Sequence, residues 1–240
     1  MVHGHTTANL GEPNYQTALN QHKNYINLLK ELELEVNELL PDENYPDSTF
    51  VEDTAVLTPE FSVLTNPGAE SRKGEIKAIE KILEEKFSNL IKIKNPDTLD
   101  GGDILEVKDH FYIGISERTN QAGADQFIEI VKKYGMTGST IPVKKGLHLK
   151  SAVSYLGNNY MLIDSEALNI NYFEGFTKIT TASGEGYAAN SISVNGSVIL
   201  PEGFPKTKEK VELAGFSVRT LNVSEFRKLD GGLSCLSLRY

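Results

Sequence analysis

The sequence predicts an α/β protein in which one ββαβ repeat recurs and closes into a ring. Three observations lead to this prediction: short strands paired through tight turns, amphipathic helices that follow them, and the return of this order at intervals of about 40–50 residues. With 240 residues, of which 39% are hydrophobic, the chain can bury a sizeable core. We therefore expect residues 1–240 to form a single domain.

Four repeats can be traced along the chain. Repeat 1 is expected to contain the strands Phe50–Leu57, Ser62–Leu64 and Leu90–Ile93, with a helix from Ile76 to Phe87. Repeat 2 is expected to contain the strands Asp103–Val107, Phe111–Ile115 and Ser139–Val143, with a helix through Phe127 and Val131 that ends at Gly135. Repeat 3 begins near Ser151 and turns at Gly157-Asn158-Asn159. Repeat 4 is expected to contain the strands Ser191–Val194, Val198–Leu200 and Phe216–Leu221, with a turn at Asn195-Gly196 and a helix that ends at Gly215.

The two ends of the chain are expected to share repeat 5. Leu233–Tyr240 is predicted to form its first strand, and the helical spacing of apolar residues from Tyr15 to Leu32, followed by Leu34–Val36, would complete it. Only Met1–Gly4 precedes the helix region, which is too short for another strand, so the closing edge is expected to lack one. Because the two termini would complete one repeat between them, the pattern favours a closed ring. The alternative is an ordinary open α/β sheet in which this order of strands and helices arises by coincidence.

Composition excludes several classes of function. The chain has 24 Lys and Arg against 33 Asp and Glu, a net charge of -9, which is the wrong sign for binding a nucleic-acid backbone. No apolar run approaches the roughly 20 residues of a membrane span. The single cysteine suits a reducing compartment, so we expect a cytoplasmic protein. The surplus of acidic residues would attract a cation, so we expect a small molecule as its partner.

Polar residues gather at or just before the first strand of each repeat, where a ring would bring them together. They are Asp47, Glu52, Asp53, Asp100, Asp103, His148, Lys150, Asn190, Asp230 and Cys235. Three of them could form a catalytic set, with Cys235 as nucleophile, His148 as proton carrier and Asp100 as the acid that orients the histidine. The plainer alternatives are an inert core thiol and a structural histidine.

Acids at Asp47, Glu52 and Asp53 would be costly near a central axis without a cation, and the planar N–H fork of a guanidinium matches carboxylates. Arg72 and Arg118, each just beyond a hairpin, could bind a substrate carboxylate. The alternatives are a turn-capping Asp47, a solvent-facing Asp53 and two solvated arginines.

These residues lie in motifs that resemble the dimethylarginine dimethylaminohydrolases, members of the guanidine-modifying or pentein superfamily. The resemblance runs from about Thr6 to Tyr240. It rests on Pro46-Asp47-Ser48-Thr49-Phe50-Val51-Glu52-Asp53, Pro67-Gly68-Ala69-Glu70-Ser71-Arg72, Asp100-Gly101-Gly102-Asp103, Arg118-Thr119-Asn120, Leu147-His148-Leu149-Lys150 and Asp230–Cys235. It implies a five-bladed α/β propeller with pseudo-five-fold symmetry, in agreement with the repeats.

The resemblance also implies an activity and a role for each matching residue. The expected reaction is hydrolysis of Nω-methylated arginines to L-citrulline and a methylamine through a covalent cysteine thiouronium. Cys235 would be the nucleophile, His148 the general acid and base, and Asp100 its supporting acid, where relatives also use glutamate. The remaining matches are substrate-binding positions: Leu10, Asp47, Glu52, Asp53, Arg72, Arg118 and Leu229.

No metal or other cofactor is implied, and zinc would act only as an inhibitor at Cys235. Relatives usually carry one more strand before Val2-His3-Gly4, so the fifth blade is expected to lack it. Alternatives are an arginine or agmatine deiminase, and a non-catalytic guanidine-binding protein. A homodimer is compatible with the sequence.

Overall fold

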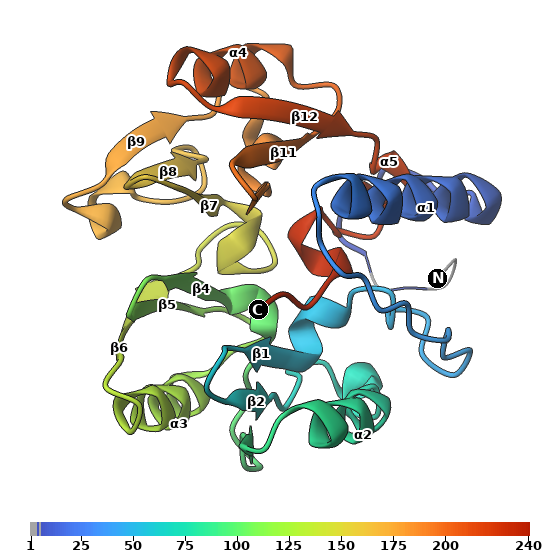
Figure 1. Cartoon of the computed structure of the whole chain (residues 1–240), viewed down its shortest axis with the longest axis vertical. Helices are drawn as coiled ribbons and strands as arrows, with labels where there is room; N and C mark the ends of the chain where they lie inside the picture. The colour runs from blue at the N-terminus through green and yellow to red at the C-terminus, as the bar shows by residue number, and fades with distance from the viewer. Residues whose placement is uncertain (1–3, 5) are drawn as a thin grey trace. The chain divides into compact units, whose positions relative to one another are not determined.

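The computed structural model describes Gly4 and residues 6–240, and it contains four three-stranded sheets (Figure 1). In every sheet the first two strands pair antiparallel and the third strand lies parallel to the second. The strands are β1 (Ala55–Leu57), β2 (Ser62–Leu64), β3 (Leu90–Lys92), β4 (Ile104–Val107), β5 (His110–Ile115), β6 (Thr137–Pro142), β7 (Val153–Gly157), β8 (Tyr160–Ile163), β9 (Thr177–Thr180), β10 (Ile192–Val194), β11 (Ser197–Pro201) and β12 (Ser217–Leu221). The mixed α/β class and the recurring strand order are therefore confirmed.

Local sequence signals explain where the helices begin and end. The helices are α1 (Tyr15–Glu31), α2 (Ile76–Lys86), α3 (Gln121–Lys132), α4 (Pro205–Leu213) and α5 (Ser224–Arg227). Asn14 and Asn120 cap α1 and α3 by accepting a backbone N–H three residues on. Pro205 lies in the first turn of α4, where its missing N–H costs nothing, and Gly215 ends that helix with a φ of 94°.

A short 3₁₀ helix lies just before the first strand of each of the four sheets. These are η1 (Val51–Thr54), η3 (Gly101–Asp103), η4 (Leu149–Ser151) and η6 (Gly186–Ala189), and η7 (Ser234–Leu236) lies near the C-terminus. The predicted strands Phe50–Leu57 and Asp103–Val107 are therefore wrong at their starts, because the chain turns before it extends. The polar residues noted in the sequence lie on or beside these turns.

Three further predictions about secondary structure are wrong. Repeat 3 connects β8 to β9 through the four-residue 3₁₀ helix η5 (Ile170–Phe173) in place of an α-helix. Leu34–Val36 is irregular, and Leu233–Tyr240 forms η7 followed by irregular backbone. Alternating apolar residues favour a strand only where a neighbour can accept its ladder of hydrogen bonds, and the described sheets pair neither segment. Residues 1–3 and 5, where the edge of repeat 5 was expected, lie outside the described residues.

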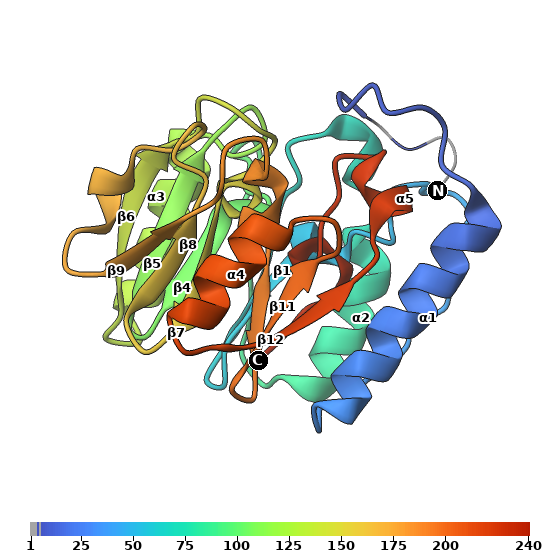
Figure 2. The same ribbon diagram turned by 90° about the horizontal axis from the view of Figure 1, so that it is seen from above.

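The chain forms two compact units, named here after a helix in each. The α1 unit contains the chain up to Pro41 together with Ser151–Ser234, and the α3 unit contains Asp42–Lys150 together with Cys235–Tyr240. In the α1 unit, helix α1 packs on α5 and β12 (Figure 2). A separate apolar cluster contains residues of α4 and of the strands β7, β8, β9 and β11. Its buried members are Leu156, Leu162, Ile179, Val198, Leu200 and Val211.

Two apolar clusters stabilise the α3 unit. The larger one packs α3 against the sheet of β4, β5 and β6, where the Phe111 and Phe127 rings meet edge to face at 5.2 Å. The second surrounds β1, β2 and α2, and Leu238 packs against it. The Tyr240 ring also lies 5.0 Å from that of Phe87. The residues that follow Cys235 are thus held against repeat 1.

Across the described chain, no helix has both the length and the apolar character needed to span a bilayer.

Replacing Asn14 by alanine should lower the free energy of unfolding by about 1 kcal/mol, because the Thr17 N–H loses the side-chain oxygen 2.9 Å away. Chemical denaturation of the purified protein measures this change. Asn14→Ser is the control, since serine also caps helices well and should lose much less. If Asn14→Ala and Asn14→Ser lower the free energy of unfolding equally, the side-chain cap contributes nothing to stability.

Candidate functional site

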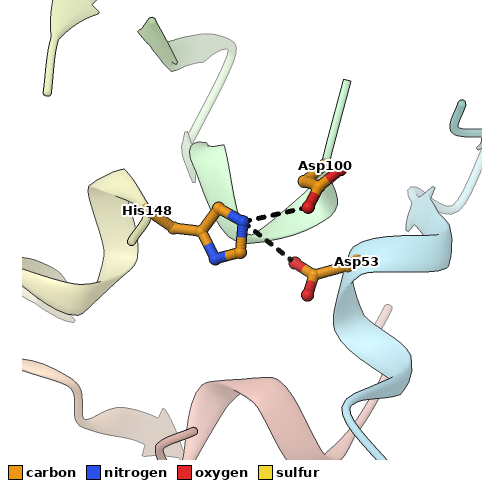
Figure 3. Close-up of side chains that lie close together, drawn as sticks. All are labelled: Asp53, Asp100 and His148. Carbon is orange, nitrogen blue, oxygen red and sulfur yellow. Dashed lines mark hydrogen bonds and ion pairs between the residues drawn. The ribbon is translucent and has the colours of Figure 1, made fainter. Parts of the chain in front are cut away.

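Three buried side chains of the α3 unit meet around one ring nitrogen (Figure 3). His148 Nε2 lies 3.1 Å from Asp100 Oδ2 and 3.8 Å from Asp53 Oδ1. His148 directly precedes η4, Asp100 caps the start of η3 and Asp53 lies in η1, so three different turns contribute. The structure therefore brings together two predicted acids and the predicted proton carrier.

Glycine at position 102 makes this arrangement sterically feasible. A Cβ atom there would lie 2.6 Å from His148 Nδ1, which is closer than real Cβ contacts allow. The Gly102 N–H also donates to Asp53 Oδ1 at 2.9 Å. One glycine thus leaves room for the ring and orients the acid that faces it.

Asp100 is held so that one of its oxygens faces the imidazole. Its Oδ1 accepts the Gly68 N–H at 2.8 Å, and its own N–H donates to Thr119 Oγ1 at 3.0 Å. Gly68 approaches the Arg118 backbone closely, since a Cβ there would lie 2.2 Å from the Arg118 carbonyl oxygen. Gly68 thus connects the Arg118 loop to the supporting acid.

Arg72 is buried and engaged in ion pairs within the α3 unit. Its Nη1 lies 2.5 Å from Asp53 Oδ2, its Nη2 lies 2.7 Å from Glu75 Oε2, and its Nη2 also donates to the Phe50 carbonyl at 2.8 Å. A longer contact of 3.4 Å reaches the Asp47 carbonyl. Arg72 therefore neutralises the oxygen of Asp53 that faces away from His148.

Electrostatics keep His148 protonated. Burial alone would lower its pKa, but the nearby carboxylates of Asp53, Asp103 and Asp100 raise the pKa to about 10. Burial would likewise raise the pKa of Asp53, but His148 and Arg72 hold it below its usual value. The site thus contains an imidazolium facing an ionised carboxylate, a state suited to donating a proton.

The donor atoms of Asp53, Asp100 and His148 lie within 4.8 Å of one another, a spacing that a cation could bridge. The imidazolium, however, already supplies a positive charge between the two carboxylates. We therefore assign no metal to this cluster.

The predicted acid Glu52 lies in the same unit but has another partner. Its Oε1 lies 2.6 Å from Lys150 Nζ and 3.9 Å from Arg239 Nη2. Arg239 belongs to the segment that begins with Cys235, which is half-buried on η7. Asp47 is buried.

The other predicted substrate-binding residues are divided between the two units. Arg118 is half-buried in the α3 unit. Leu10 and Leu229 belong to the α1 unit, where Leu10 is 49% exposed and Leu229 is 5% exposed. Backbone contacts from Leu10 and Leu229 stay predictions.

Within the α3 unit, two buried acids received no role from the sequence. Glu75 pairs with Arg72. Because Glu75 follows Arg72 by three residues in a helical region, this spacing could have predicted the ion pair. Asp103 ends the Asp-Gly-Gly-Asp motif and is 0% exposed. Burial raises the pKa of Asp103, and His148 opposes that rise.

Comparison with known proteins identifies the family. The family model described as "N,N dimethylarginine dimethylhydrolase, eukaryotic" matches residues 5–178. The N(G),N(G)-dimethylarginine dimethylaminohydrolase of Pseudomonas aeruginosa is 44% identical over 100% of this chain and 95% of its own length. The chain belongs to the dimethylarginine dimethylaminohydrolase family.

Solved structures of dimethylarginine dimethylaminohydrolases agree with this assignment. A cysteine-to-serine mutant of the Pseudomonas aeruginosa protein, complexed with citrulline, matches with a TM-score of 0.97 and 44% identity over 100% of this chain and 94% of that chain. A histidine-to-glycine mutant, an adduct with S-methyl-L-thiocitrulline, matches with a TM-score of 0.96, 44% identity and the same coverage. The recognition made from the motifs is confirmed.

The first prediction from the site concerns the charge of His148. NMR titration of the histidine ring should give a pKa of about 10, well above the ordinary 6.5. Because the folded-state pKa is raised, the stabilisation from this proton is fully present below pH 6.5 and is lost as the pH rises towards 10. A ring that loses its proton near pH 6.5 in the folded protein would contradict this prediction.

The second prediction concerns Gly102. Gly102→Ala should push the His148 ring away from Asp53 and Asp100, so its pKa should fall towards 6.5 in the same NMR titration. Gly138→Ala is the control, because its Cβ would also make a close contact, at 2.9 Å, but with Ile128 Cγ1 in place of the His148 ring. An unchanged His148 pKa in Gly102→Ala would show that the close approach does not constrain the ring.

Proposed function

We propose that this protein hydrolyses Nω-methylated arginines, dimethylarginine and monomethylarginine, to L-citrulline and a methylamine. The observation that carries this proposal is the buried His148 ring, whose Nε2 faces the carboxyl groups of Asp100 and Asp53, in a chain 44% identical over its whole length to a named dimethylarginine dimethylaminohydrolase. The related structures hold citrulline or an S-methyl-L-thiocitrulline adduct, both of which are arginine-like amino acids. A small guanidinium amino acid is thus the proposed partner.

Cys235 is the proposed nucleophile, and His148 is the proposed general acid and base. Cys235 is the only cysteine in the sequence. In the two related structures, the mutated cysteine and histidine are separated by the same number of positions as Cys235 and His148. This equal spacing supports carrying both roles to this chain.

The proposed reaction has two stages. In the first, the Cys235 thiolate forms a bond to the guanidinium carbon, and the His148 imidazolium donates its proton to the departing amine as the carbon–nitrogen bond breaks. This leaves a covalent thiouronium and a neutral imidazole. In the second, the imidazole takes a proton from water as the water oxygen attacks the same carbon. The carbon–sulfur bond then breaks to restore the thiolate, and the remaining hydroxyl proton passes to solvent, which leaves neutral citrulline and the His148 imidazolium.

The acids are proposed to hold the cation and the catalytic histidine. Asp100 orients His148 through the 3.1 Å contact, while Asp53 faces the same nitrogen and binds the guanidinium of the substrate. Asp47 and Glu52 are proposed to hold the guanidinium or amino group. Lys150 pairs with Glu52 in the ligand-free protein. When substrate binds, Lys150 either shares the Glu52 carboxylate with the substrate or moves away from that carboxylate.

The opposite end of the substrate is proposed to contact Arg72 and Arg118 through its α-carboxylate. Arg72 already meets Asp53 and Glu75 in the protein without substrate, so it would bind the carboxylate in addition to these acids. Leu10 and Leu229 are proposed to contribute backbone contacts.

We also propose that the repeats close into a five-bladed α/β propeller and that residues 1–240 act as one catalytic domain. Four sheets with one strand order support this architecture, as does the helix α1 at the predicted place of a fifth helix. No cofactor is proposed, and zinc is proposed only as an inhibitor at Cys235. A cytoplasmic location is proposed from the lone thiol, and the homodimer stays a prediction.

The activity is tested by measuring citrulline from dimethylarginine, monomethylarginine, arginine and agmatine. We expect product from the methylated arginines and its loss in Cys235→Ser, with a fall in kcat of at least about 1,000-fold. Product from arginine or agmatine alone would indicate a deiminase instead. Absence of product from all four would leave only guanidine binding.

A further inference from the structure

Four polar side chains connect each repeat to the next through a backbone N–H. Three of the acceptors lie on or directly after a 3₁₀ turn, and the fourth lies in β7. The pairs are Asp53 Oδ1 with Gly102 N at 2.9 Å, Asp103 Oδ1 with Leu149 N at 2.9 Å, Ser154 Oγ with Ser191 N at 3.0 Å, and Asn190 Oδ1 with Ser234 N at 3.0 Å. Each of these contacts lies within one of the two compact units.

Two of these links end beside a residue with a proposed catalytic role. Leu149 directly follows His148, and Ser234 directly precedes Cys235. The Ser154 link ends at Ser191, and Ser154 Oγ also donates to the carbonyls of Ala189 and Ser191. Ser154 therefore holds the backbone on both sides of Asn190.

Asp103 is constrained to a single orientation. It is 0% exposed, its Oδ2 accepts the Ser116 hydroxyl at 2.7 Å, and its Oδ1 accepts the Leu149 N–H. A Cβ at Gly114 would lie 2.4 Å from Asp103 Oδ1, so a larger residue there would displace the acid. A buried carboxylate is costly unless hydrogen bonds compensate it, and these bonds fix the turn that begins after His148.

Asn190 forms two bonds with the residue before the thiol. Its Oδ1 accepts the Ser234 N–H, and its Nδ2 donates to Ser234 Oγ at 3.0 Å. The close approach depends on Gly232, where a Cβ would lie 2.4 Å from Asn190 Oδ1. The Tyr187 hydroxyl also donates to the Gly231 carbonyl at 2.7 Å. The backbone that leads to Cys235 is therefore held at two points.

We propose that Asp103 and Asn190 are positioning residues, which hold the turns beside His148 and Cys235 through the N–H groups of Leu149 and Ser234. This inference rests on the proposed function of those two side chains. A misplacement of a reacting group by about 1 Å can cost about 100-fold in rate, so the two hydrogen bonds control kcat without touching the substrate.

The test compares Asp103→Ala and Asn190→Ala with the control Thr58→Ala, at equal fractions of folded protein. Thr58 is likewise buried, and its Oγ1 accepts the Phe61 N–H at 3.0 Å in the turn between β1 and β2. With dimethylarginine, the first two variants should lose about 100-fold in kcat with little change in KM, while Thr58→Ala should retain kcat. Asp103→Asn keeps an acceptor for the Leu149 N–H and should recover most of the loss. If Asp103→Ala does not fold, Asn190→Ala against Thr58→Ala decides the question.

Two further measurements do not depend on turnover. Asn190→Ala should speed amide hydrogen exchange in the peptide around Ser234 and Cys235, and Asp103→Ala should lower the His148 pKa in an NMR titration. The groups that face His148 are Asp53, Asp100 and Asp103, so the first two acids still act on the ring in that variant.

The proposal is overturned if Asp103→Ala and Asn190→Ala lower kcat no more than Thr58→Ala, or if Asp103→Asn is as inactive as Asp103→Ala. A wild-type protein with no activity on methylated arginines would reject the proposed function. In that case the exchange and NMR measurements still decide whether the two side chains hold these turns.

Discussion

Two carboxylates face the same ring nitrogen of His148 at a depth where neither would be stable without a nearby positive charge. The proton on the ring supplies that charge for Asp53 and Asp100, and Arg72 supplies it for the second oxygen of Asp53. Removing His148 or Arg72 would leave these buried carboxylates with less positive charge beside them. The arrangement thus raises the pKa of the histidine to about 10, which suits the proposed protonation of a departing amine.

The backbone around this cluster holds the histidine and its two acids in place. Gly102 leaves space for the ring, and its N–H orients Asp53, while the Gly68 N–H orients Asp100. These residues lie on turns where the chain bends before it extends into a strand. Because such turns recur at the same place in each repeat, residues about 50 positions apart occupy neighbouring turns. The repeat therefore supplies a site whose components are distributed along the sequence.

The state of the site fits the chemistry of the dimethylarginine dimethylaminohydrolase family. A guanidinium substrate carries its own positive charge, so its binding favours ionised acids and a thiolate nearby. Glu52 already pairs with Lys150, and Arg72 already pairs with Asp53 and Glu75. The charges proposed to bind the amino acid substrate thus pair with one another in the ligand-free protein.

Residue patterns were sufficient to predict the α/β class, the strand order within each sheet, α1, α2, α3 and α4, and the acids and histidine that meet. These features depend on neighbours in the chain, such as the apolar spacing of α3, the Asn14 cap of α1 and the glycine that ends α4. The motifs also identified the family, because a cysteine, a histidine and several acids in one order are rarely shared by chance.

Other features depend on contacts between distant residues, which no local pattern contains. Leu233–Tyr240 alternates like a strand but has no partner among the described sheets, and it packs on repeat 1 instead. The pairing of Arg72 with Asp53, the contact of Lys150 with Glu52 and the raised pKa of His148 arise only when burial removes water from charges brought together. The sequence by itself determined which side chains were available for the chemistry, and the tertiary structure decided their partners and charges, since both are set by proximity in a medium of low polarity.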